Sequence, residues 1–459
     1  MIGPRFAFFL LPIAVSGFVA AATAESVTYN KQIAPIIYNN CSVCHRPGEA
    51  APFALLSYQD VAKRGKLIAQ VTKSQYMPPW KAEKTSFNFK DERRLSENDI
   101  RLIDEWVKAG MPEGKAADTP PAPKFASGWR LGEPDMVIEV PVAFKVPADG
   151  ADIYRNIAIP LGLTEDKWLT AIDMKPTARP VVHHVLYFSD PTGKSHQKQD
   201  GDQPGFGGII PSPNAAGLGG WAVGAQPHMQ PEGLALKLPK GSDFIVQYHF
   251  HPDGKVETEK ATLGLYFAKE PPKRTLTGIQ LPPSFGLFAG IDIPAGDKDF
   301  VVKDSFTLPV DYDAISVGAH AHYIATKMKM TATLPNGEVL TLLSIRDWDF
   351  AWQDRYYFDH FVPLPKGTRI DAEVHWNNTA ETPRNPSNPP IHVTWGEQSV
   401  DEMGAVGLQG VPHAESDLKT LQAAIQQHTM RQVQARIAAD PGFMKKVQAM
   451  FGSQPSPLQ

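Results

Sequence analysis

The sequence predicts a multidomain protein in which a small all-α domain is followed by two all-β sandwich domains, jelly-roll-like in type, and a C-terminal helical tail. At 459 residues the chain is long enough for about three domains. Its 42 prolines and 36 glycines separate short runs rich in Val, Ile, Thr and Tyr over most of its length, as is typical of turn-rich β structure. Helical periodicity, in contrast, is found near the two ends.

The first residues read as an export signal. Arg5 gives a short positive stretch, residues 6–14 are apolar, and Ala-Thr-Ala at residues 22–24 is a cleavage site of the A-x-A kind. We therefore expect a signal peptide over residues 1–24, a mature chain that begins at Glu25, and a periplasmic location. The alternative is a membrane anchor, but the apolar run is short for a span, and we expect no membrane span elsewhere.

The next part of the chain, residues 25–117, contains two segments with helical periodicity. Residues 30–38 place isoleucines on one face, and residues 96–108 begin at a serine that can cap a helix. Between them, residues 41–45 have the sequence CSVCH, which contains both cysteines of the chain. A proline-rich linker over residues 118–134 follows.

The CSVCH pentapeptide matches the attachment signature of c-type haem. The thiols of Cys41 and Cys44 can form two thioethers to the haem vinyl groups, and His45 can supply the proximal iron ligand. The alternatives are a redox dithiol, which does not require the histidine, and half of a zinc site, which lacks further ligands nearby. We therefore expect one covalent haem c in a small all-α cytochrome c domain.

A haem used for electron transfer usually has methionine as its second axial ligand. Met77 is the first methionine after His45, and it precedes two prolines that hold a loop extended. Met111, after the second helical segment, is the rival. We favour Met77, because a loop before the last helix can fold over the open face of the haem.

From about residue 136 the pattern changes to short strands separated by Gly, Pro and Asp. This stretch is long enough for two β-sandwiches, which we place at residues 135–281 and 282–412. The expected break lies near Pro282. Residues 413–459 form a polar, helix-prone tail to which no function can be assigned.

Three histidine clusters lie in the β region. They are His183 with His184, His249 with His251, and His320 with His322. An H-x-H pair on a strand places both imidazoles on one face, as a metal clamp requires. Adjacent histidines need a bulge or a strand end to act together. The thioether of Met403, which follows an Asp-Glu pair, would suit copper that cycles through Cu(I) better than zinc.

The β region resembles the type II ascorbate-dependent copper monooxygenases, the family of peptidylglycine α-hydroxylating monooxygenase and dopamine β-monooxygenase. The likeness covers residues 135 to about 410 and rests on four motifs in order. They are the His183-His184 pair, the segment from Trp221-Ala222 through Pro231-Glu232-Gly233 to the Gln-x-His strand, the H-x-H pair, and Asp401-Glu402-Met403. The haem signature ahead of this module resembles an architecture of exported bacterial proteins.

The resemblance implies two copper ions, held in separate β-sandwich domains that face each other across a solvent cleft. The ligand positions are His183, His184 and His249 for the electron-supplying copper, and His320, His322 and Met403 for the copper that binds O2 and takes hydrogen from a substrate C–H bond. The second group contains the expected catalytic residues. His251 stands next to a ligand position and is left out.

Two features depart from the animal members of that family. Those enzymes are held together by disulfides, whereas both cysteines of this chain are expected to carry haem, so the sandwiches must rely on their cores. In addition, Met403 is followed by Gly404 where those enzymes have cysteine. Neither departure removes an expected ligand.

Other candidates have weaker claims. His228 lies in a loop near the segment expected to form the cleft. Residues 346–353 are rich in tryptophan and charge, which predicts either a buried cluster at a domain interface or a wall beside the substrate. His375 and His392 have no partner in sequence and are interpreted as structural.

Together these observations predict a periplasmic copper-dependent monooxygenase. It would hydroxylate a C–H bond of a small-molecule or peptide substrate with O2, using electrons that its own haem relays from an external redox protein. The alternatives are an oxidoreductase that passes substrate electrons out through the haem, and a non-enzymatic copper-binding electron-transfer protein. A net charge of −4 gives no indication of a nucleic-acid partner.

Overall fold

The computed structural model describes residue 3 and residues 26–49, 51–125, 128–208, 211–212 and 214–451. Apart from residue 3, the predicted signal peptide and its cleavage site lie outside the described residues, as does the end of the predicted tail. Among the helices of the described ranges, none combines the length and the apolar character that crossing a membrane requires.

The first β-sandwich consists of two facing sheets, with strand orders β1-β10-β4-β7-β11 and β3-β8-β5-β6. Their inner faces share one core, to which Leu265 and Tyr248 contribute from opposite sheets. A short ribbon of β2 and β9 closes one end. The strands are β1 (Met136–Glu139), β2 (Phe144–Val146), β3 (Ile153–Pro160), β4 (Lys167–Lys175), β5 (Val182–Asp190), β6 (Ala216–Ala222), β7 (Leu234–Leu238), β8 (Asp243–Phe250), β9 (Glu257–Glu259), β10 (Thr262–Phe267) and β11 (Arg274–Thr275).

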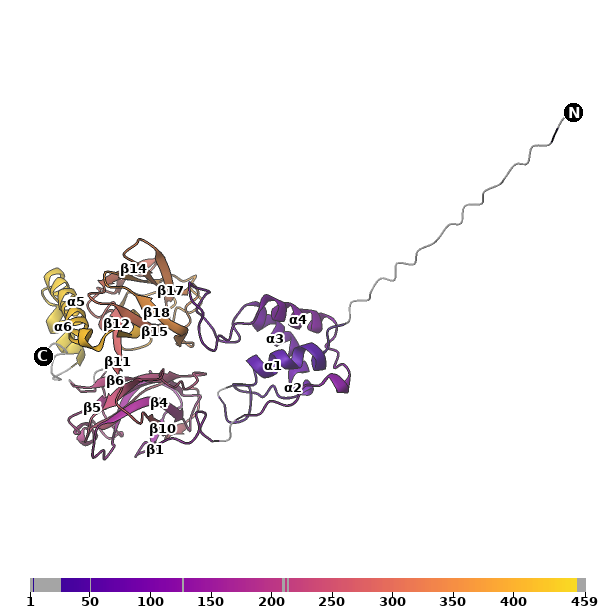
Figure 1. Cartoon of the computed structure of the whole chain (residues 1–459), viewed down its shortest axis with the longest axis horizontal. Helices are drawn as coiled ribbons and strands as arrows, with labels where there is room; N and C mark the ends of the chain where they lie inside the picture. Colours follow the sequence, from indigo (N-terminus) through magenta and orange to yellow (C-terminus); the bar gives the residue numbers. More distant parts are fainter. Residues whose placement is uncertain are drawn as a thin grey trace.

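The second β-sandwich has the sheets β12-β21-β15-β18 and β14-β19-β16-β17, with a ribbon of β13 and β20. The chain crosses into it at Leu276, between β11 and β12, upstream of the predicted break at Pro282. Helices α5 (Leu418–Ala439) and α6 (Phe443–Phe451) pack on this sandwich, where Leu421 and Phe443 join its core (Figure 1). The strands are β12 (Thr277–Leu281), β13 (Asp292–Ile293), β14 (Phe300–Thr307), β15 (Tyr312–Ala321), β16 (Ala325–Thr333), β17 (Val339–Ile345), β18 (Arg355–Leu364), β19 (Arg369–Trp376), β20 (Val393–Thr394) and β21 (Gly404–Pro412).

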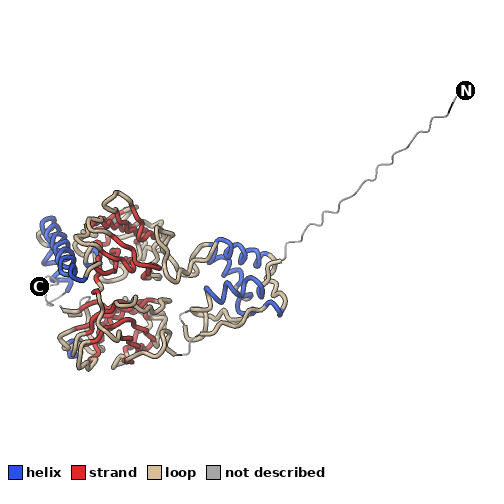
Figure 2. Tube along the Cα trace, viewed as in Figure 1, coloured by secondary structure: helices blue, strands red, loops and turns tan. Residues whose placement is uncertain are grey.

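The N-terminal helices lie beside the two sandwiches (Figure 2). Ile37, Ile103 and Trp106 are fully buried where these helices pack together. Ser96 caps the last helix by accepting a hydrogen bond from the backbone N–H of Asp99, and the Asp99 carboxylate returns the contact. The helices are η1 (Tyr29–Ile33), α1 (Ala34–Asn40), α2 (Tyr58–Ala62), α3 (Gly65–Lys73) and α4 (Glu97–Lys108).

The prediction of a small all-α cytochrome c domain ahead of the sandwiches is wrong. Strands hold 33% and helices 19% of the described residues, so the structure is mostly β, and the helices near the N-terminus do not stand as a domain of their own. Residues 76–95, which we call the aromatic strap, leave the helical cluster and run onto the second sandwich. Ala82 and Phe89 of the strap are buried in the core of that sandwich, and Phe89 bridges to Phe358 on β18.

The aromatic residues of the strap explain why the prediction fails. The short helices do not bury the rings of Trp80, Phe87 and Phe89. These rings pack instead against Tyr356 and Phe358, at centroid distances of 5.0 to 5.6 Å. Burying one such ring contributes about 1.5–3 kcal/mol. The strap therefore ties the helical cluster to the second sandwich.

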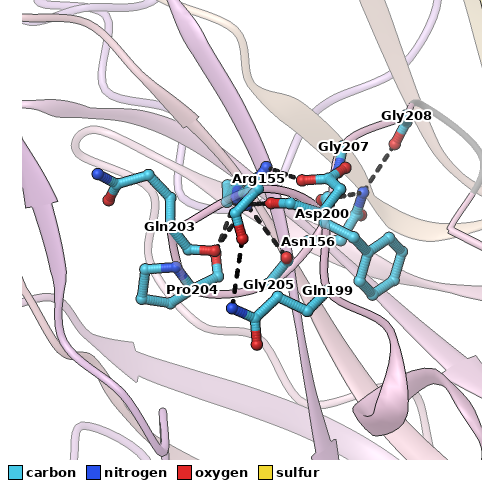
Figure 3. A network of polar contacts seen from close by, with 11 residues as sticks. Arg155, Asn156, Gln199, Asp200, Gln203, Pro204, Gly205, Gly207 and Gly208 are labelled. Atoms are coloured by element: carbon cyan, nitrogen blue, oxygen red, sulfur yellow. Dashed lines mark hydrogen bonds and ion pairs between the residues drawn. The ribbon is translucent and has the colours of Figure 1, made fainter.

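A polar network holds the loop of residues 199–208 against β3 (Figure 3). The Arg155 guanidinium donates to several backbone carbonyls of this loop, including a hydrogen bond of 2.8 Å to Pro204 O. Behind it, the buried Asn156 side chain accepts a hydrogen bond of 2.9 Å from Gln247. Gln247 stands two residues before His249 on β8, so the network supports the strand that carries this histidine.

Candidate metal centre

The first histidine set comes from two paired strands of the first sandwich. His184 on β5 lies directly opposite His249 on β8, and the register shifts between Val182 and His184. This irregularity is the bulge that the adjacent pair needs, because it lets His183 turn to the same side as His184. The Nδ1 atom of His184 lies 3.0 Å from that of His183 and 3.4 Å from that of His249.

These three imidazoles form a group that could hold a metal ion. One nitrogen of each lies within 4.8 Å of the others. Among the described residues, no other group of three His, Cys, Asp or Glu side chains comes as close together. Three converging nitrogens leave room for a further ligand in a four-coordinate site.

The second histidine set comes from the second sandwich. His320 is on β15 and His322 directly follows this strand. Ala321 pairs with Gly404 on β21, and this register places Met403 beside His322 at the end of the two strands. Both imidazoles and Met403 line one cavity. Two nitrogens and a thioether sulfur form a donor set that fits copper better than zinc.

Each imidazole of the second set has one ring nitrogen engaged, which leaves the other for a metal. His320 Nδ1 lies 2.5 Å from Oε1 of Gln353, and His322 Nδ1 lies 3.1 Å from the backbone carbonyl of Asp401. The Nε2 atoms are therefore the candidate ligand atoms. Such outer partners fix the tautomer and orientation of ligand histidines.

Burial keeps all five imidazoles neutral at pH 7. It lowers the pKa of His183 to about 3 and that of His320 to about 4, and it also lowers the pKa values of the other three, His184, His249 and His322. A neutral imidazole has a free lone pair, and metal binding requires that form. The two sets are therefore ready to bind a metal without losing protons.

Asp152 is an outer partner that sequence reasoning missed. Its Oδ2 lies 3.0 Å from Nε2 of His249, and Ser399 of the second sandwich donates a hydrogen bond to the same carboxylate. Burial would raise the pKa of the Asp152 carboxyl, but the hydrogen bonds from its partners hold this pKa below its usual range. An ionised Asp152 can hold Nε2 of His249, so that Nδ1 of this ring faces His183 and His184, where a metal would bind.

Asp152→Asn is expected to weaken metal binding at the first histidine set by about 10–100-fold, since an outer partner of a ligand is lost. Competition with a Cu(I) chelator measures this affinity. His251→Gln is the matched control, because His251 is an exposed partner of Asp152, with Nδ1 2.7 Å from Oδ1, and lies outside the set. Equal affinities for Asp152→Asn and the wild type would show that the carboxylate does not orient His249.

Glu402 is a second residue whose role the sequence did not reveal. Its carboxylate is buried and accepts hydrogen bonds from the backbone N–H groups of His322 and Ile324, at 2.9 and 2.8 Å, and from the Trp376 indole at 2.9 Å. Burial raises the pKa of Glu402 to about 8 in spite of these donors. The side chain fixes the chain segment after His322 relative to Met403.

The two histidine sets lie close together, which differs from the separated sites that the family resemblance implies. The ring centroids of His184 and His320 are 6.0 Å apart. Phe350 lies between the sets, stacked on His183 at 4.3 Å and edge-on to His322 at 5.5 Å. The two sets therefore form one compact metal centre at the junction of the sandwiches.

A cavity of about 520 Å³ opens onto this centre. Trp221 and Leu186 line it from the first sandwich, and Tyr357 and Gln409 line it from the second. Cavities of this size commonly hold a small molecule. Four of the five imidazoles, all except His183, reach its wall.

The haem signature forms a turn at the end of α1. The backbone N–H groups of Cys44 and His45 both donate to the Cys41 carbonyl, at 3.1 and 2.9 Å. The two thiols are free rather than joined in a disulfide. His45 Nδ1 lies 3.2 Å from the Phe53 carbonyl, which leaves Nε2 as the ligand atom. This arrangement fits a haem bound through two thioethers and a proximal histidine.

The two candidate distal ligands have different surroundings. The Met111 sulfur packs against Gly65 and belongs to the apolar cluster of the helices, and its carbonyl accepts a hydrogen bond from Tyr58. Met77 lies at the start of the aromatic strap, just after α3. The Met111 sulfur thus takes part in the packing of the helices, and Met77 stays the predicted distal ligand.

The remaining candidates have ordinary partners. The His375 and His392 rings are in hydrogen-bond contact with the carboxylates of Asp299 and Asp292, at 2.8 and 2.6 Å, and neither lines the cavity. His228 lines the cavity and its ring packs on Tyr357. Residues 346–353, by contrast, contribute Phe350 and Gln353 directly to the metal centre.

No protein-family model matches the chain, and no curated protein matches it either. Several solved structures show weak similarity, and three of them illustrate it. They are a structure of the Sulfolobus Turreted Icosahedral Virus (10% identity over 67% of this chain and 99% of that chain, TM-score 0.25), a Paenibacillus xanthan lyase (11%, 66% and 28%, TM-score 0.16) and the major capsid protein P2 of bacteriophage PM2 (10%, 53% and 100%, TM-score 0.19). These TM-scores carry no argument about fold or function.

Proposed function

We propose that the protein is a periplasmic copper-dependent monooxygenase whose own c-type haem relays electrons to two copper ions. The observation that carries the proposal is the compact metal centre, in which five neutral imidazoles lie close together and four of them, with Met403, line one cavity. Copper would supply one-electron redox chemistry and O2 activation there, and the haem at Cys41 and Cys44 would supply a one-electron carrier.

The chain's own residues would hold and orient the metals. His183, His184 and His249 would bind one ion, and His320, His322 and Met403 would bind the other. Gln353 and Asp152 engage the outer nitrogens of His320 and His249, which limits rotation of these rings. A rigid ligand set favours fast one-electron transfer, because little rearrangement is needed when the charge of the ion changes.

The cavity beside the metal centre would hold the substrate. Hydroxylation converts R–H, O2, two electrons and two protons into R–OH and water. The apolar rings of Trp221, Phe285 and Tyr357 in the cavity wall would exclude bulk water from the C–H bond that reacts. The volume suits a small molecule or the end of a peptide.

The experiment that tests the proposal is oxidation of the reduced haem by O2 in the mature, copper-loaded protein. The haem absorbance is followed after mixing with O2, and oxygen uptake is recorded in parallel. We expect oxidation that requires copper and is lost in His320→Ala. Copper-loaded protein that consumes no O2 with reduced haem present contradicts the proposal.

The same experiment separates the alternative functions. If a substrate reduces the haem in the absence of O2, electrons flow from the substrate to the haem. The protein is then an oxidoreductase that passes substrate electrons out through the haem. If copper binds but neither reaction occurs with any substrate class, the protein is a copper-binding electron-transfer module.

A further inference from the structure

One loop joins the aromatic strap to the metal centre. Residues 346–354, which we call the connecting loop, run from the end of β17 to the start of β18. On its outer side, Lys81 of the strap forms an ion pair of 2.8 Å with Asp347, and Arg93 pairs with Asp354. The backbone N–H of Glu83 adds a hydrogen bond of 2.8 Å to the Ser344 carbonyl beside the loop.

The inner side of the connecting loop contacts the histidines. Gln353 lies 2.5 Å from Nδ1 of His320, and Phe350 stacks on His183. The Phe350 ring also pairs with the rings of His249, His322 and Tyr323. Gln353 and Phe350 both contact a histidine and adjoin a residue in contact with the strap, since Asp349, next to Phe350, lies 3.8 Å from Lys81. The neighbour of Gln353 differs in that it contacts the strap through an aromatic ring.

That neighbouring residue is Trp352. Its ring lies 6.4 Å from the ring of Tyr76 in edge-to-face geometry, and Tyr76 directly precedes Met77 in the chain. The indole Nε1 of Trp352 is buried and has no hydrogen-bond partner in the described structure. A buried N–H without a partner costs about 1–3 kcal/mol, so hydrogen bonding does not account for a tryptophan at this position.

These residues form a continuous series from the start of the aromatic strap to the metal centre. Met77 and Tyr76 are linked covalently, Tyr76 touches Trp352, Trp352 and Gln353 are linked covalently, and Gln353 is in hydrogen-bond contact with His320. Electron tunnelling falls steeply with distance and is favoured by covalent bonds, hydrogen bonds and aromatic rings over open gaps. Only one step of this series, between the two rings, passes through space.

We propose that Trp352 carries electrons from the haem to the metal centre, which they enter at His320. The inference rests on the proposed function and adds the route. One electron leaves the ferrous haem iron, which becomes ferric, and reduces one cupric ion to cuprous. No bond forms or breaks, and a one-electron redox protein re-reduces the haem. The rings of His320 and His184, 6.0 Å apart, would then pass electrons to the first histidine set. Electrons would thus reach the two coppers in the reverse of the order that the family resemblance implies.

The test uses the mature chain loaded with haem and copper, without O2. A photochemical one-electron reductant reduces the haem in a flash, and its reoxidation is followed optically while the cupric signal is followed by electron paramagnetic resonance. For the wild type we expect a first-order phase whose rate is independent of protein concentration. For Trp352→Leu we expect loss of this phase, with iron content, copper content and the cupric spectrum unchanged.

Two matched variants isolate the role of the indole. Trp352→Phe keeps an aromatic ring and is expected to retain the first-order phase. Trp80→Leu removes a different strap ring, which packs on Tyr356 at 5.0 Å and has no ring contact with Trp352 in the described structure, and it is also expected to retain the phase. Direct reduction of copper by ascorbate should proceed equally in Trp352→Leu and the wild type, which shows that the metal centre is intact.

Three outcomes would overturn the inference. A first-order phase of unchanged rate in Trp352→Leu excludes this route while the proposed function stands. Equal loss of the phase in Trp352→Leu and Trp80→Leu assigns the effect to docking of the strap. The wild-type protein could also lack iron or copper, or hold both and show no first-order phase. Either result contradicts the proposed electron relay, and the route through Trp352 then fails with it.

Discussion

Replacing Cys41 and Cys44 together by serine is expected to abolish covalent haem. These are the two cysteines of the chain, so no other thiol can form a thioether. Serine is close to cysteine in size, and the turn that follows α1 is held by backbone hydrogen bonds to the Cys41 carbonyl, so the fold should survive. Haem staining after denaturing electrophoresis should disappear, and the iron content should fall from one per chain to near zero.

Copper should remain in this double variant, because both histidine sets belong to sandwiches whose cores contain no residue of the CSVCH turn. The single variant Cys41→Ser is the control, since it keeps one thioether and therefore covalent haem. Haem that stays attached after denaturation of the double variant would contradict the assignment of the pentapeptide.

Gly404→Ala is expected to destabilise the second sandwich strongly. A Cβ at this position would lie 2.3 Å from Cζ2 of Trp376 and 3.1 Å from Cγ1 of Val374. Trp376 is fully buried and donates a hydrogen bond to Glu402, so it cannot move aside freely. Overpacking of this kind costs about 1–3 kcal/mol, and we expect the upper end of that range because backbone and ring are both confined.

The displaced backbone carries Met403, so copper at the second histidine set should also be lost. Chemical denaturation measures the stability, and metal analysis measures the copper. Gly407→Ala on the same strand is the matched control, because a Cβ there would meet nothing within 4 Å, and its stability should stay within about 0.5 kcal/mol of the wild type. Equal stability and copper content of the two alanine variants would contradict this account.

The same contact gives a physical reason for one departure from the copper monooxygenases. The space that a side chain at residue 404 would occupy is filled by the Trp376 ring. The tryptophan in turn holds Glu402, which fixes the segment between His322 and Met403. A glycine after Met403 is thus part of the packing that supports the proposed ligand.

Much of the candidate site follows from local sequence rules. The two-residue period of a strand predicts that His320 and His322 share a face, and both line the same cavity. The adjacent pair His183 and His184 required a distortion, and the register shift after Val182 is that distortion. These features depend only on neighbours along the chain, so periodicity is sufficient to find them.

Contacts between segments that are far apart in the sequence could not be predicted from periodicity. Asp152 and Ser399 come from different sandwiches, and no spacing in the sequence connects them to His249. The closeness of His184 and His320 depends on the relative orientation of the two sandwiches. Periodicity within a strand contains no information about that orientation.

The aromatic strap was missed for a different reason. Its prolines and Met77 were interpreted only as a loop over the haem, which left Trp80, Phe87 and Phe89 unexplained. The alternation of Phe87 and Phe89 is itself a signal of an extended segment with one buried face. Had this signal been weighed, the N-terminal region would not have been predicted as an independent all-α domain.

Metal analysis of the mature protein tests the central claim most directly. The account predicts one iron and two coppers per chain in the wild type, and one iron and one copper in both His183→Ala and Met403→Ala. A wild-type chain that binds zinc in place of copper, or a single copper that either substitution removes, would contradict the proposal of two copper sites supplied by one haem.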